Sequence, residues 1–168
     1  MTRVPDDEWD GELIIHNLPR PEGLIEVDTV ADIGAGIRPM NWYKPRLHLC
    51  VEPHKTYAER LQRRGHKVIP MTAFQYLKLQ QKIEAIYLLD VIEHMEKHDG
   101  FEVIDLMTRK ATKQVVVYTP RGFMEQTTDD WGLDGEIWQT HRSGWTADDF
   151  PDWHIENYGR GFFAVLTI

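Results

Sequence analysis

The most constraining stretch of the sequence is residues 29–37, a short apolar run that stops at two glycines separated by one residue. An acid, Asp32, stands two residues before the first of them, Gly34. Glycine lets the backbone turn sharply and approach a ligand closely. A carboxylate beside such a turn repels a phosphate and attracts a cationic amine. We therefore expect a buried strand that delivers a glycine turn to a binding site.

The same turn argues against a dinucleotide site. A dinucleotide fingerprint carries a third glycine three positions after Gly36, and Pro39 occupies that position. A nucleotide-dependent oxidoreductase is therefore a disfavoured alternative. The pattern Asp32-x-Gly34-x-Gly36 instead resembles the first motif of the class I S-adenosylmethionine-dependent methyltransferases. The resemblance implies that the cofactor's methionine moiety lies against this turn, which consists of Asp32, Ile33, Gly34, Ala35 and Gly36.

Length and composition are those of one globular domain over residues 1–168. A chain of this size can bury a core without crosslinks. The single cysteine, Cys50, excludes a disulfide framework and suits a reducing compartment. No apolar run approaches the roughly 20 residues that cross a bilayer, so we expect a cytoplasmic protein without a membrane partner. Residues 1–27 predict an irregular lead-in around an apolar patch at 13–15.

The net charge of −8 bears on partners. A protein that binds nucleic acid usually presents a basic face to the phosphates, so nucleic acid is not an expected partner. A local basic group at residues 60–67 is interpreted as the solvated face of a helix. The sequence does not indicate an oligomeric state.

A second strand is predicted at residues 47–52, and it ends in Glu52. Pro39 and Pro45 make a long helix between the first two strands unlikely to form, which departs from the usual pattern of the family. In nucleoside-binding α/β folds an acid at the end of the second strand accepts hydrogen bonds from both ribose hydroxyls. We assign that role to Glu52, with Pro53 beside it.

A helix at 54–64 and a third strand at 66–70 should follow. The resemblance implies that Thr72 and Ala73, just past that strand, bracket the adenine. Phe74 is equally compatible with adenine contact and with the core of a helix at 74–79.

The second strong signal is the continuous apolar run at 83–89, typical of a strand buried on both faces of a parallel sheet. It leads into Asp90-Val91-Ile92-Glu93-His94. This string resembles the fourth motif of small-molecule class I methyltransferases, and the resemblance adds Asp90 and Val91 to the cofactor site. Nucleic-acid amino-methyltransferases carry a proline-rich turn at this point, which this chain lacks.

A metal site is not expected. His94 and His98 lie four residues apart, but Met95 stands where the zinc-protease pattern requires glutamate, and no third ligand is evident.

The rest of the chain predicts a helix at 100–112, a fifth strand at 114–120 and a terminal hairpin from strands at 154–158 and 162–168. Together these elements predict an α/β fold with a doubly wound, mostly parallel, seven-stranded, Rossmann-like sheet and a C-terminal antiparallel hairpin. Residues 123–144 lack periodicity and are expected to cover the substrate, with their glycines as hinges.

The function that the resemblance implies is methyl transfer from S-adenosylmethionine to a small-molecule acceptor. His94 and His141 are the candidate bases, because an unperturbed imidazole pKa near 6.5 suits removal of a hydroxyl proton. The alternative is a non-catalytic S-adenosylmethionine- or nucleoside-binding protein, or a subunit of a complex. The sequence does not name the acceptor.

Overall fold

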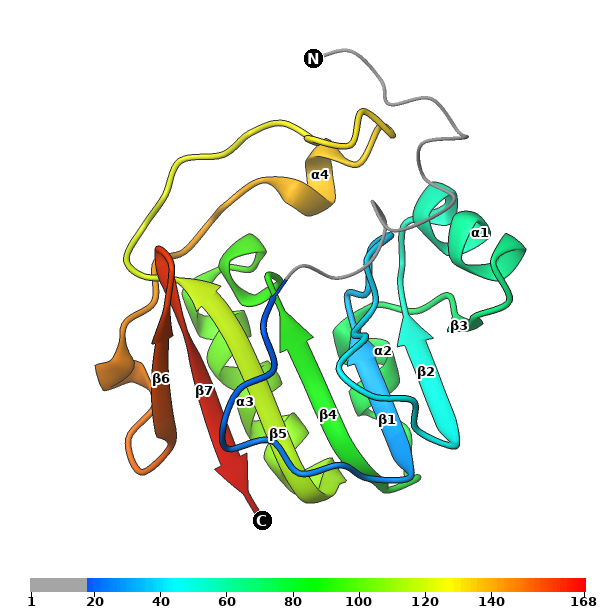
Figure 1. Ribbon diagram of the computed structural model, residues 1–168. Coiled ribbons are helices and arrows are strands. Elements are labelled where there is room, and N and C mark those ends of the chain that lie inside the picture. The colour runs from blue at the N-terminus through cyan, green and yellow to red at the C-terminus, as the bar shows by residue number, and fades with distance from the viewer. Residues whose placement is uncertain (1–17) are drawn as a thin grey trace.

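The structure is a computed structural model that describes residues 18–168, and its centre is one mixed seven-stranded sheet (Figure 1). The strand order is β3-β2-β1-β4-β5-β7-β6. The first five of these run parallel, β7 is antiparallel to β5, and β6 is antiparallel to β7. The predicted fold class is confirmed. The strands are β1 (Thr29–Ile33), β2 (Leu47–Val51), β3 (Lys67–Ile69), β4 (Ile83–Leu89), β5 (Ala111–Pro120), β6 (His154–Tyr158) and β7 (Gly161–Thr167).

The helices are short and lie mostly where the sequence predicts them. Two 3-10 turns, η3 and η4, accompany them. Helix α3 begins three residues before the predicted start at Gly100, and Glu96 O accepts a hydrogen bond from Gly100 N–H. The sequence does not predict α4 or η3. None of the helices in residues 18–168 is long and apolar enough to cross a membrane. The elements are α1 (Lys55–Arg63), α2 (Ala73–Leu77), η3 (Ile92–His94), α3 (Lys97–Lys110), α4 (Glu136–Gln139) and η4 (Ala147–Asp149).

The two faces of the sheet are covered differently (Figure 1). Helices α2 and α3 pack on one face, where Val103 and Met107 meet the apolar side chains of β4 and β5. The other face is covered largely by chain without helix or strand, including residues 18–28 and 40–43. Residues 18–27 contain no helix or strand, and the apolar patch at 13–15 lies outside the described residues.

The sheet reverses its winding between β1 and β4. From β1 the chain proceeds outward to β2 and β3, then crosses to β4 and continues to β5 on the other side. Ligands of doubly wound sheets bind beyond the carboxyl ends of the strands at such a switch point. In the described chain, residues 34–46 contain no helix, as the two prolines predict. The glycine turn therefore opens directly onto this edge.

Candidate cofactor and acceptor site

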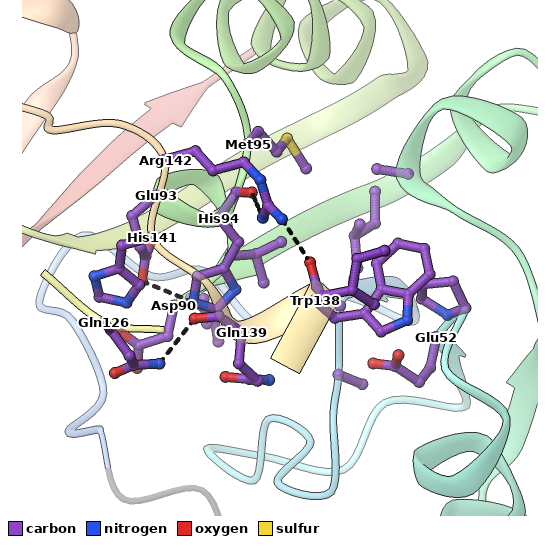
Figure 2. Close-up of a pocket in the computed structure, with 18 of the residues that line it drawn as sticks. Glu52, Asp90, Glu93, His94, Met95, Gln126, Trp138, Gln139, His141 and Arg142 are labelled. Atoms are coloured by element: carbon purple, nitrogen blue, oxygen red, sulfur yellow. Dashed lines mark hydrogen bonds and ion pairs between the residues drawn. The ribbon is translucent and has the colours of Figure 1, made fainter. Parts of the chain in front are cut away.

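A cavity of about 710 Å³ lies over the carboxyl ends of β1, β2 and β4. Strand ends form its floor, and residues 123–144 contribute much of its remaining wall (Figure 2). Asp32 and Gly36 are not among its lining residues. The other predicted site residues all line it: Ile33, Gly34, Ala35, Glu52, Pro53, Thr72, Ala73, Asp90, Val91, His94 and His141.

The turn after β1 requires glycine at both positions. Gly34 and Gly36 have φ of 68° and 60°, a region that other residues rarely adopt. A Cβ on Gly34 would lie 2.6 Å from Val91 Cγ2, and one on Gly36 would lie 2.7 Å from the Trp131 ring. The turn is therefore packed between the loop after β4 and the segment over the cavity.

Asp32 lies beneath this turn. Its Oδ2 accepts hydrogen bonds from Met40 N–H at 2.7 Å and from His48 Nε2 at 3.1 Å. The short irregular stretch after Gly36 folds back over β1 and brings the Met40 amide to the carboxylate. Contact between Asp32 and a ligand's amine thus stays a prediction, whereas its part in holding the residues after the turn is visible in the structure.

Glu52 stands at the end of β2 and faces the cavity. Its Oε2 accepts from Gly36 N–H at 2.8 Å and its Oε1 accepts from His54 N–H at 2.9 Å. These two bonds fix the carboxylate, and each oxygen keeps a further lone pair. Burial raises the pKa of Glu52 to about 7, so its charge is sensitive to pH in the neutral range.

Asp90 follows β4 in a strained backbone conformation, with φ of 55°. Its N–H donates to Tyr118 O, and its side chain is exposed to the cavity. Removal from bulk water raises the pKa of Asp90 to about 6. The positive charge of Arg38, another lining residue, lowers this pKa but only partly offsets the increase.

The loop after β3 ends in a capping box that holds the start of α2. Thr72 Oγ1 accepts from Gln75 N–H, and Gln75 Oε1 accepts from Thr72 N–H. The cap presents Thr72 and Ala73 to the cavity. Phe74 both lines the cavity and packs against the main core, so the two interpretations of this residue are compatible.

At the other end of the cavity lie Glu93, His94 and His141 (Figure 2). The imidazole rings of His94 and His141 stack with centroids 5.1 Å apart. Glu93 Oε1 is 3.9 Å from His94 Nε2, and Glu93 Oε2 accepts from Thr119 Oγ1 at 3.0 Å. His141 Nδ1 is 2.7 Å from Met124 O. Because a carbonyl only accepts, His141 Nδ1 is the donor, and in the neutral form of the ring Nε2 carries the lone pair.

Burial changes the acid–base character of this cluster. It lowers the pKa of His94 to about 3, with smaller contributions from His141 and Arg142, so the imidazole is neutral at neutral pH. The assumption of an unperturbed histidine pKa is wrong for His94. Burial also raises the pKa of Glu93, and the charge of Asp90 adds to that effect.

We call residues 123–144 the covering segment. It passes over the carboxyl ends of the strands and carries α4 (Figure 1). Nine of its residues line the cavity: Met124, Gln126, Asp130, Trp131, Ile137, Trp138, Gln139, His141 and Arg142.

One anchor of the covering segment is the buried carboxylate of Asp129. It accepts the N–H groups of Trp131, Leu133 and Gly135 at 2.9, 2.9 and 3.0 Å. Trp131 packs edge to face on Tyr57 of α1, with ring centroids 5.1 Å apart. A Cβ on Gly135 would lie 1.9 Å from the Tyr57 hydroxyl. Close packing thus explains Gly135, which the sequence suggested as a hinge.

A second anchor is Arg142. Its Nη1 donates to the carbonyls of His94 and Thr140, its Nη2 donates to Ile137 O, and its backbone N–H donates to Glu93 O. These bonds join the covering segment to η3. Sequence reasoning missed both Asp129 and Arg142. An acid followed by Gly132 and Gly135 is a turn pattern that could have indicated Asp129.

No family model and no curated protein matches this sequence. The fold is similar to that of an S-adenosylmethionine-dependent methyltransferase from Archaeoglobus fulgidus, with a TM-score of 0.60 and 14% identity over 83% of this chain and 85% of that chain. It is also similar to magnesium protoporphyrin IX methyltransferase from Synechocystis with bound S-adenosylhomocysteine, with a TM-score of 0.54 and 13% identity over 83% and 73% of the two chains.

A third similar structure is an O-methyltransferase from neocarzinostatin biosynthesis in complex with S-adenosylmethionine and a naphthoic acid. The TM-score is 0.55 and the identity 10%, over 81% of this chain and 47% of that chain. At these identities the likeness establishes the fold alone, which this chain shares with the three solved methyltransferases.

Proposed function

We propose that this chain binds S-adenosylmethionine and transfers its methyl group to a small-molecule acceptor. The observation that carries the proposal is the position of Glu52, a buried carboxylate at the end of β2 that faces the cavity and is bonded to the glycine turn of β1. Its oxygens keep lone pairs for two ribose hydroxyls. Solved proteins of the same fold contain this cofactor or its product.

The lining residues suit the parts of such a ligand. Glu52 binds the ribose, and Thr72, Ala73 and Phe74 flank the adenine. Gly34 and Ala35 leave room for the amino-acid portion near Asp90. S-adenosylmethionine supplies an electrophilic methyl group on a sulfonium. The work of the chain is then to align a nucleophile and exclude water.

We place the acceptor beside His94 and His141, under the covering segment. Gln126 and Arg142 lie next to the histidines, because Gln126 O accepts from His141 N–H and Arg142 Nη1 donates to His94 O. Ile137 and Trp138 add apolar surface to the cavity. This mixture is usual in pockets that orient a small ligand. A hydroxyl acceptor would be activated at the two histidines, of which His141 presents a free Nε2 and His94 alone is a weak base.

The direct test is calorimetry with S-adenosylhomocysteine and NAD, followed by mass spectrometry for methyl incorporation into a small-molecule library. We expect saturable binding of S-adenosylhomocysteine at one site, and none of NAD, because Pro39 replaces the glycine of a dinucleotide turn. Binding of NAD without binding of S-adenosylhomocysteine would refute the proposal. Cofactor binding without methyl transfer to any acceptor would favour a non-catalytic binding protein.

The affinity for S-adenosylhomocysteine should depend on pH. Ribose hydroxyls donate to the ionised Glu52, whose pKa is raised to about 7, so ligand binding favours the deprotonated form. Affinity should therefore fall by about tenfold as the pH is lowered from about 8 to about 6. The pKa of Asp90 lies in the same range, so a control must separate the two carboxylates. In Glu52→Gln the change of affinity with pH should largely vanish. An unchanged pH profile in that variant would assign the effect to another group.

A further inference from the structure

The cluster of Glu93, His94 and His141 has the donor set of a metal site. One ligand atom from each side chain lies within 4.8 Å of the other two. Two imidazoles and one carboxylate recur in mononuclear zinc and iron sites that keep positions open for substrate. We propose that these three side chains bind one divalent transition-metal ion at the acceptor end of the cavity.

The ligand atoms are already oriented by contacts outside the cluster. The hydrogen bond from His141 Nδ1 to Met124 O directs the lone pair to Nε2. Thr119 Oγ1 holds Glu93 Oε2, which leaves Oε1 as the oxygen nearer to His94. Supporting bonds of this kind fix the ring orientation and tautomer of metal-binding histidines.

The surroundings of the Glu93 carboxyl group also leave a place for a cation. Glu93 is buried, and no arginine or lysine of residues 18–168 forms an ion pair with its carboxylate. Arg142 lies beside it, but its side chain donates to three backbone carbonyls instead. A second carboxylate, Asp90, faces the same space. A buried carboxylate is normally paired or bound to a metal, and a divalent ion held by the cluster would stabilise the ionised form of Glu93.

The present spacing is somewhat wider than that of a loaded site. Ligands about 2.1 Å from an ion are roughly 3 to 3.5 Å from one another, so binding would draw the cluster together by about an ångström. His141 belongs to the covering segment and Glu93 and His94 to η3, so the ion would also link these two parts. Imidazole ligands suit zinc, iron and similar transition-metal ions such as cobalt, whereas magnesium and manganese prefer oxygen ligands.

The role of the ion rests on the proposed function. An acceptor hydroxyl that binds at an open position becomes more acidic and releases its proton to bulk water. Its oxygen then forms a bond to the methyl carbon while the carbon–sulfur bond breaks, and the electron pair of that bond stays on sulfur. In this form of the reaction neither histidine acts as a free base.

The experiment uses protein treated with a chelator and dialysed, without cofactor. Zn²⁺ and Co²⁺ are titrated in by calorimetry, and the visible absorption of Co²⁺ reports nitrogen and oxygen ligation. We expect one saturable equivalent in the wild type, and a loss of affinity of at least about tenfold in both His94→Gln and His141→Gln. His98→Gln is the matched control, because that side chain is exposed and pairs with Asp99, and it should bind like the wild type.

The absence of saturable binding in the wild type, or wild-type metal affinity in both histidine variants, would overturn the proposal. If a variant fails to fold, the cobalt spectrum of the wild type still shows whether nitrogen and oxygen ligands bind the ion. Calorimetry with S-adenosylhomocysteine in the presence of chelator keeps the two proposals apart. If the product binds and the metals do not, only the metal site fails. If the metals bind and the product does not, the proposed function fails and the metal site stands.

Discussion

Replacing Glu52 with alanine is expected to weaken the binding of S-adenosylhomocysteine by about 1 to 3 kcal/mol, which is roughly five- to 150-fold in the dissociation constant. Two effects combine. The ribose hydroxyls lose a shared acceptor, and the amides of Gly36 and His54 lose the carboxylate that now orders the binding edge. Calorimetry at about pH 8, where Glu52 is ionised, measures the difference.

The matched control is Glu59→Ala on α1. Glu59 is a partly exposed glutamate that pairs with Lys55 away from the cavity, and its loss should leave affinity unchanged. Melting temperatures are recorded for both variants. If Glu52→Ala binds as tightly as the wild type while its melting temperature drops sharply, Glu52 is a structural acid and the ribose assignment is wrong.

Asp129→Ala should release the covering segment from the cofactor end of the cavity. The substitution removes the acceptor of three backbone N–H groups in a buried turn, for a local cost of about 3 kcal/mol. The sheet does not depend on these bonds, so the global fold should persist. Limited proteolysis should cut between residues 123 and 144 at least about tenfold faster than in the wild type. Fluorescence of Trp131 should change as it leaves Tyr57.

The neighbouring Asp130→Ala is the control for this effect. Asp130 is exposed, and within residues 18–168 its side chain accepts a hydrogen bond from Thr128, two residues before it in the sequence. We expect its cleavage rate to match the wild type. In the wild-type chain, cleavage should slow further when S-adenosylhomocysteine and an acceptor are both present. Equal rates in Asp129→Ala and wild type would show that Asp129 does not control the order of the covering segment.

The sheet could be predicted because its signals are local. The run at 83–89 is apolar at nearly every position, so it indicates a strand buried on both faces, as β4 is. Glu52 is recognisable because it ends such a run. Boundaries were less accurate where polar residues continue an element, as at the start of β5, where Thr112 and Lys113 are exposed.

The contacts that assemble the site could not be predicted in this way, because they join distant parts of the chain. His94 was compared with His98, its neighbour in sequence, whereas its spatial neighbour is His141. That pairing depends on the path of the covering segment, whose sequence has no hydrophobic periodicity from which its structure could be predicted. The environment of Asp32 likewise depends on how the chain after Gly36 folds back to bring the Met40 amide to it.

The two ends of the covering segment meet at the sheet. Gly122 N–H donates to Trp145 O at 2.7 Å, and Arg121 and Gly122 both bridge to Trp145, which is fully buried. Because the closure point is already fixed, doubling the length of the enclosed loop would add only about 0.6 kcal/mol of entropic cost. The length and sequence of the covering segment can therefore change without unfolding the sheet. Libraries that vary residues 124–139 around a fixed Asp129 should retune which acceptors are accepted, while the strands that hold Gly34 and Glu52 stay as they are.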